Sequence, residues 1–279
     1  ILRIKGVSGK AAKVSKVARG KSWKDPRTWG PFGLIAGGAL TARDAEAEPG
    51  ITFTESQSEE IYNPWPINIG EFFNPQHKII KDDLINFFNE YEKKLPEGNE
   101  QLRDNNYVGN YNLYQSKYNL LKEHENNEIL NGVFQFIAKS VLRISSIANE
   151  KELENLKNNN PKFKVNAKES WFIRYNKGGF VLPHNHQDCS WSCVYYVRIG
   201  KDAGKKNGST FFLRPYSGSA PKLDFGGKYS TEDLAVINAE EGKLLVWPNY
   251  IYHGSHPYEG KEDRMIISAN LTVDLDNNK

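Results

Sequence analysis

The chain has 279 residues, of which 38% are hydrophobic and 12% aromatic, so it can bury a core and is not globally disordered. Two cysteines, Cys189 and Cys193, are too few for a disulfide scaffold. The net charge of +3 is uneven, because residues 1–28 carry nine Lys and Arg against one acid and leave the remainder near −5. A fold without a basic excess argues against nucleic acid as its main partner.

Residues 1–50 read as an appendage to the fold. The basic run is followed by a short apolar stretch at 32–40, interrupted by glycines and too short to span a bilayer, and then by small residues. This order is typical of a targeting peptide, and a disordered tail or a remnant of an upstream fusion fits equally well. We expect a tail at 1–50, one domain at 51–279, no membrane span, and a cytoplasmic protein unless the tail directs it elsewhere.

Helical periodicity dominates the first half of this domain. After a predicted edge strand within 61–73, apolar residues recur at three- and four-residue spacing over 77–94 and again over 126–148, with a short helix at 150–156. Residues 99–115 are polar and Asn-rich, which predicts a loop. The helical part, 77–157, is therefore expected to form a layer on one side of a later sheet.

From residue 163 onward the hydrophobic period changes to two, which predicts a β core over 163–273. Turn signals rich in glycine separate the segments, and several short strands with such punctuation indicate a sandwich, barrel or jelly roll. The expected strands are 163–167, 170–175, 191–199, 209–213, 234–237, 243–247 and 264–273. The fold class is thus mainly β with flanking helices (α+β).

The segment Pro183 to Tyr196, PHNHQDCSWSCVYY, holds His184, His186 and Asp188 within five positions. Alternate residues of an extended segment point the same way and lie ~6.5–7 Å apart, so all three would share one face. A further ligand stands downstream at His253. Two imidazoles and a carboxylate with open positions suit non-haem Fe(II) and oxygen chemistry.

Arg264 opens the last predicted strand. Alternation puts Arg264, Ile266, Ser268 and Asn270 on one face, and gives the other face an apolar set for packing. A half-buried arginine costs several kcal/mol, on the order of a buried ion, unless it finds a partner. A dianionic co-substrate bound through two parallel hydrogen bonds would be such a partner.

Three segments together resemble the 2-oxoglutarate/Fe(II)-dependent oxygenases common in marine bacteria and phages. They are PHNHQDCSWSCVYYV, NGSTFFLRP and EGKLLVWPNYIYHGSHPYEGKEDRMIISANL, and the resemblance covers about residues 165–273. That family carries a His-x-His stretch running into a Ser-Gly-Val-Tyr-Tyr strand, and a Gly-x-Leu-x-x-Phe-Pro…His…Arg tail. Cys193 stands where the family usually has Gly.

The resemblance implies a double-stranded β-helix (jelly-roll, cupin-like) core with an N-terminal helical layer. It also implies Fe(II) held by His186, Asp188 and His253, with His184 as the alternative to Asp188; His-x-Asp is the pattern of the wider superfamily, whereas His-x-His is typical of this family. The distal carboxylate of 2-oxoglutarate would bind Arg264, with pocket residues at Tyr195, Ser268 and Asn270. Aromatic walls would come from Phe172, Tyr195, Phe211 and Trp247, whichever of these point inward.

The activity that this implies is hydroxylation of a substrate with O2, releasing succinate and CO2. The substrate is expected to be a small molecule or a peptide. Two other classes stay open: a cupin-like metalloenzyme that does not use 2-oxoglutarate, and a non-catalytic β-sandwich binding module. The first has no need of Arg264, and the second tolerates loss of the iron site.

Overall fold

The computed structural model describes residues 66–99, 112–156, 161–201, 207–216, 227 and 231–275. The predicted tail at 1–50 and the first part of the predicted domain lie outside these residues. Ile67–Lys279 clusters as one compact unit. Each described helix is too short or too polar to cross a membrane.

The helices lie in the first half of the described chain, and most of the strands lie in the second half. A short strand precedes the helices, and most of the strands follow them. In chain order the elements are β1 (Gly70–Phe73), α3 (His77–Lys94), β2 (Leu113–Gln115), α4 (Leu120–Glu123), α5 (Glu128–Ala148), α6 (Glu150–Asn155), β3 (Phe163–Tyr175), β4 (Trp191–Arg198), β5 (Thr210–Leu213), β6 (Leu234–Ile237), β7 (Lys243–Pro248), β8 (His253–Ser255) and β9 (Arg264–Leu275).

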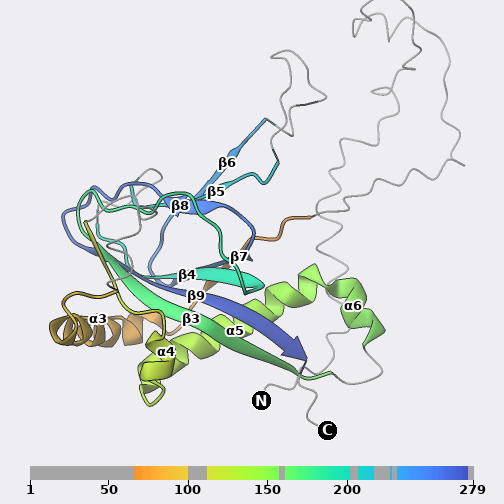
Figure 1. Ribbon diagram of the computed structural model, residues 1–279, viewed down its shortest axis with the longest axis horizontal. Coiled ribbons are helices and arrows are strands. Elements are labelled where there is room, and N and C mark those ends of the chain that lie inside the picture. The colour runs from red at the N-terminus through yellow and green to blue at the C-terminus, as the bar shows by residue number, and fades with distance from the viewer. Residues whose placement is uncertain are drawn as a thin grey trace, which may run out of the picture. The chain divides into compact units, whose positions relative to one another are not determined.

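Two antiparallel sheets make the β core. The larger has the order β1-β7-β4-β9-β3-β2 and the smaller the order β6-β5-β8. Neighbours in the large sheet are often distant in sequence, as where β9 lies between β3 and β4. The smaller sheet lies on one side of the large sheet and the helices lie on the other (Figure 1). This is the predicted arrangement, a double-stranded β-helix with a helical layer.

Alternation along the central strands divides the core in two. Met265, Ile267, Ala269 and Leu271 of β9 pack with the apolar stripes of α3 and α5. Ile266 instead joins the second cluster, which includes Phe212 and Trp247. The apolar face predicted for the last strand is therefore the face that carries the helices. The opposite face is left for the site.

The predicted elements agree with the structure over the long segments. The strands predicted at 163–167 and 170–175 form one strand, β3, which is interrupted by a register shift between Ala167 and Glu169. The loop predicted at 99–115 ends in a strand, β2, because Leu113–Gln115 pairs with β3. The edge strand predicted within 61–73 is β1, which pairs with β7 at the edge of the large sheet. Two short elements were not predicted: α4, and β8, which pairs with β5.

Candidate metal and co-substrate site

His184 and His253 are brought together by backbone pairing. The His184 N–H donates to the carbonyl of His253, and the His253 N–H donates to the carbonyl of His184, both at 2.9 Å. The His186 N–H donates to the carbonyl of Asn249 at 3.0 Å. These bonds fix the His-x-His segment against the turn between β7 and β8, so that residues about 70 positions apart share one place.

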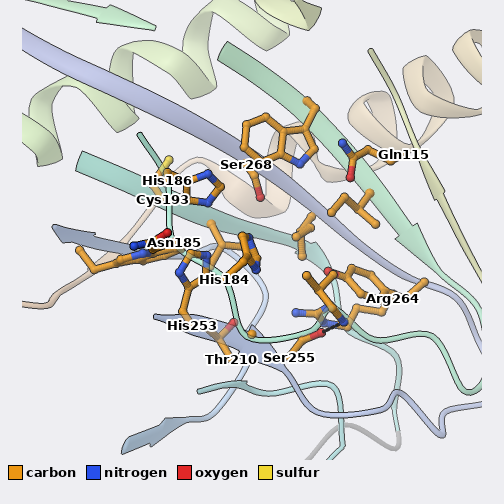
Figure 2. Close-up of a pocket in the computed structure, with 18 of the residues that line it drawn as sticks. Gln115, His184, Asn185, His186, Cys193, Thr210, His253, Ser255, Arg264 and Ser268 are labelled. Carbon is orange, nitrogen blue, oxygen red and sulfur yellow. Dashed lines mark hydrogen bonds between the residues drawn. The ribbon is translucent and has the colours of Figure 1, made fainter. Parts of the chain in front are cut away.

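The three imidazoles form a compact group. One nitrogen from each of His184, His186 and His253 lies within 4.8 Å of the others. The ring centroids are 4.4 Å apart for His184 and His253, 4.9 Å for His184 and His186, and 5.1 Å for His186 and His253. Figure 2 shows the rings turned toward a common space. Three imidazoles are a donor set that suits Fe, Zn, Cu or Ni.

Backbone carbonyls set the tautomers of two of these rings. His184 Nδ1 lies 2.8 Å from the carbonyl oxygen of Leu182, and His253 Nδ1 lies 3.0 Å from that of Ile251. Since a carbonyl only accepts, each Nδ1 carries the proton and Nε2 keeps its lone pair. Both rings therefore offer Nε2 to a metal, with the other nitrogen anchored as metal-binding histidines usually are.

Burial keeps these rings neutral. Desolvation lowers the pKa of His253 well below its ordinary value, and charge repulsion from His184 and His186 lowers it further. Desolvation and His184 lower the pKa of His186 to about 3, and desolvation lowers the pKa of His184. Neutral imidazole is the form that binds a metal, so the site needs no proton loss from these rings near pH 7.

Asp188 does not share this space. Its side chain is exposed, and it is not part of the metal-binding group found among the described residues. The prediction assumed an extended segment, in which alternate side chains share a face. Asp188 instead has φ 56°, in the left-handed region, so the alternation ends before it. The geometry therefore favours the alternative set, in which His184 takes the place of Asp188.

A cavity of about 360 Å³ joins the histidines to Arg264. Arg264 is 1% exposed, and neither its Nε nor its Nη1 has a hydrogen-bond partner among the described residues. A buried cation with free donors is costly unless a ligand completes it. A carboxylate is the group whose two oxygens match the planar donor edge of a guanidinium.

The surroundings hold the guanidinium in place. It lies 4.3 Å from the ring centroid of Tyr175 and 5.3 Å from that of Tyr196. The Tyr196 hydroxyl is in turn 2.6 Å from Thr210 Oγ1, which also lines the cavity. Gly208 has φ +67°, and a Cβ there would lie 3.0 Å from Arg264 Cδ, so glycine allows this close approach.

The other predicted pocket residues divide into two groups. Ser268 lines the cavity as expected, between Arg264 and the histidines along β9. Tyr195 does not: it faces the helices, where His77 Nδ1 lies 2.8 Å from its hydroxyl. Adjacent residues of a strand point to opposite faces, so Tyr195 and Tyr196 of β4 face opposite ways. It is Tyr196 that faces Arg264.

Asn270 is not a cavity residue either. Its Nδ2 donates to Glu169 Oε2 at 2.7 Å and lies 3.2 Å from His186 Nδ1. It therefore sits behind a histidine rather than beside a co-substrate. Of the predicted aromatic walls, Trp247 lines the cavity, whereas Phe172 packs against the helices.

Sequence reasoning missed Gln115 and Thr210. Both line the cavity, Gln115 from the end of β2 and Thr210 from the start of β5 (Figure 2). Gln115 lay in a predicted loop, and no pattern marked it. Thr210 was part of a predicted strand, and alternation alone could have placed it on the inner face.

Comparison with known families identifies the domain. Residues 169–270 match the family described as "Putative 2OG-Fe(II) oxygenase". The matched range contains the three histidines and Arg264. Gln115 and the helices precede it. No curated protein sequence matches the chain significantly.

Several solved structures are similar to parts of the chain at low sequence identity. AviO1 from Streptomyces viridochromogenes Tue57 is 15% identical with a TM-score of 0.46, over 74% of this chain and 90% of that one. The viral collagen prolyl hydroxylase vCPH from Paramecium Bursaria Chlorella virus-1 is 13% identical with a TM-score of 0.40, over 73% and 94%. A 2OG-Fe(II) oxygenase family oxidoreductase from Burkholderia pseudomallei is 14% identical with a TM-score of 0.29, and this chain spans 44% of its length.

The matched segment contains most of the parts of the fold that build the site: the second half of β3, β4, the His-x-His segment, β8 and the first half of β9. The donor set and the free arginine fit the iron and 2-oxoglutarate on which that family depends. Residues 169–270 of the chain thus match the 2OG-Fe(II) oxygenase family, and this segment carries the three histidines and Arg264.

Proposed function

We propose that His184, His186 and His253 hold Fe(II), that Arg264 binds the distal carboxylate of 2-oxoglutarate, and that the enzyme hydroxylates a small molecule or a peptide side chain. The observation that carries this proposal is the cavity itself. It has three neutral imidazoles at one end and at the other a buried guanidinium, whose Nε and Nη1 have no partner in the part of the chain that the structure describes.

The chain's own residues have separate tasks in this proposal. Arg264 orients the co-substrate by its planar fork, and Tyr175 and Tyr196 keep that fork in place. The Nε1 of Trp247, buried and without a partner among the described residues, is a further donor on the wall. Apolar side chains such as Ile173 and Ile266 exclude water, which strengthens these interactions. Bound Fe(II) with 2-oxoglutarate and O2 supplies the oxidation, and succinate and CO2 are the co-products.

The size of the cavity limits the substrate. About 360 Å³ is near the lower end of the ~300–1,000 Å³ usual for ligand sites, and 2-oxoglutarate must share it. We infer that the reacting part of the substrate is small, such as a metabolite or one side chain of a peptide. Gln115 and Tyr118, which lie in β2 and just after it, form a wall where such a group would contact the protein. We propose a cytoplasmic enzyme, and the free thiols Cys189 and Cys193 are compatible with such a reducing compartment.

An anaerobic titration tests the proposal. Metal-free protein is given Fe(II) and then 2-oxoglutarate, and the visible charge-transfer band of a chelated 2-oxo acid is recorded. A band at one equivalent, absent in His253→Ala, is the expected result. Fe(II) binding without a band would favour a cupin-like metalloenzyme that does not use 2-oxoglutarate. No Fe(II) binding would favour a non-catalytic module.

A further inference from the structure

Asn270 lies directly behind His186. It faces the same side of β9 as Arg264 and Ser268, and it pairs in register with Ser192 of β4 and Glu169 of β3. Its side chain is 3% exposed. The Ser192 hydroxyl donates to Asn270 Oδ1 at 3.0 Å, and Asn270 Nδ2 lies 2.7 Å from Glu169 Oε2 and 3.2 Å from His186 Nδ1. A buried amide is thus shared between a hydroxyl, a carboxylate and an imidazole.

His186 differs from the other two histidines in what its Nδ1 meets. Backbone carbonyls accept the Nδ1 protons of His184 and His253 and leave Nε2 for the metal. For His186 to bind in the same way, its Nδ1 must also carry a proton and needs an acceptor. Of the Asn270 amide, it is the nitrogen, a donor, that faces this Nδ1. In that arrangement the proton of His186 sits on Nε2, where the metal would bind.

A half-turn of the amide resolves this conflict. Rotation by 180° exchanges the oxygen and the nitrogen, so that Oδ1 accepts from His186 Nδ1–H. Nδ2 then donates to Ser192 Oγ, which can accept as well as donate. The Ser192 O–H then turns to Cys189 Sγ, 3.8 Å away, and the exposed Glu169 side chain turns from the amide oxygen to water. Both orientations therefore satisfy the buried groups.

We propose that Asn270 is a positioning residue whose amide oxygen holds the Nδ1 proton of His186 when the metal is bound, and that Glu169 competes by holding the amide the other way. The inference rests on the proposed ligand set. It adds that metal affinity depends on two residues that never touch the metal. Loss of a hydrogen bond to a metal-binding histidine typically weakens metal affinity by about 10- to 100-fold.

Variants at Asn270 separate an acceptor from a donor. Asn270→Leu keeps the size and removes both groups, so the metal Kd should rise by about 10- to 100-fold. Asn270→Asp can only accept. It is made together with Glu169→Gln to avoid a pair of like charges, and its metal Kd should stay within about threefold of wild type. Glu169→Gln alone should bind metal as tightly as wild type or more tightly.

The measurement is anaerobic binding of Fe(II), with Co(II) as an air-stable probe, in the absence of 2-oxoglutarate. Proton NMR of the Co(II) protein adds a readout that a purely structural role would not move. Three shifted, exchangeable imidazole N–H signals are expected, and Asn270→Leu should displace one of them and leave two. Asn166→Leu is the matched control, because this amide also bridges strands, to Asp274 at 2.6 Å, away from the cavity.

Each outcome has a separate meaning. Equal losses in Asn270→Leu and in the Asp-containing double variant would overturn the proposal, because the donor would then be what matters. Unchanged affinity in Asn270→Leu would overturn it as well. If Asn270→Leu melts at a lower temperature than Asn166→Leu, the metal Kd is measured in Asn270→Ala instead, and the same rise in Kd is expected. Wild-type protein that binds no metal, or His186→Ala that binds it fully, would instead refute the proposed ligand set.

Discussion

Replacement of Arg264 by methionine separates function from stability. Met fills a similar volume but has no charge and no donors. We expect Arg264→Met to lose 2-oxoglutarate binding while the metal-free protein keeps or gains stability. The second half of this expectation follows from the burial of the guanidinium, since a buried ion without a counter-ion is a net cost to the fold.

The magnitudes follow from the contacts. Because Nε and Nη1 have no partner among the described residues, a carboxylate at the guanidinium would gain about two charge-assisted hydrogen bonds, each of about 1.5–3 kcal/mol. Their loss, about 3–6 kcal/mol, corresponds to roughly two to four orders of magnitude in Kd. On the stability side, the desolvation of the ion costs several kcal/mol, on the order of the penalty for one buried charge. The contacts with Tyr175 and Tyr196 return about 0.5–2 kcal/mol each.

The assay is the anaerobic titration with Fe(II) and 2-oxoglutarate, beside thermal melting of the metal-free protein. Arg143→Met, at an exposed position of α5, is the matched control and should change neither quantity. A 2-oxoglutarate Kd within threefold of wild type in Arg264→Met would refute the assigned role. A large fall in melting temperature would show that Arg264 is a structural ion instead.

Three further predictions concern the rest of the site. His184→Ala should lose Fe(II) whereas Asp188→Ala should keep it at one equivalent; the reverse, measured by metal analysis after gel filtration, would restore Asp188 as the ligand. Gln115→Leu should leave the 2-oxoglutarate titration unchanged and remove substrate-dependent succinate release; a weakened titration would place Gln115 at the co-substrate. Lowering the pH should destabilise the metal-free protein. The pKa of His186 is about 3 in the fold and ~6.5 when unfolded, so between these values the unfolded state binds more protons. The free energy of unfolding therefore decreases as the pH is lowered. Urea midpoints at pH 7 and 5 should show this fall, and a smaller one in His186→Ala; an equal fall in both would contradict it.

The last strand shows how far a sequence pattern can go. Period-two alternation predicted both faces of β9, and the structure confirms that Met265, Ile267 and Ala269 pack against the helices. It also put Arg264 and Ser268 on the site face. Alternation does not predict which neighbouring side chains each residue of that face contacts. This is why Asn270, on the predicted face, proved to lie behind His186 rather than beside a co-substrate.

The ligand segment shows where such reasoning ends. Parity predicts directions only in an extended chain, and the positive φ at Asp188 breaks that condition. No local signal distinguished His184 from Asp188. The choice depends on the paired hydrogen bonds between His184 and His253, which are contacts between distant parts of the chain. Likewise β2 is a strand only because it pairs with β3, so Gln115 could not be placed in advance.

Anomalous diffraction from crystals grown anaerobically with Fe(II) and 2-oxoglutarate is the most direct test of the whole account. We predict one iron peak ~2.0–2.2 Å from the Nε2 atoms of His184, His186 and His253, a distance usual for metal–imidazole bonds. The 2-oxoglutarate should run from this iron to Arg264, with its distal carboxylate hydrogen-bonded to the guanidinium. An iron peak bound by Asp188, or a co-substrate that does not reach Arg264, would contradict the account.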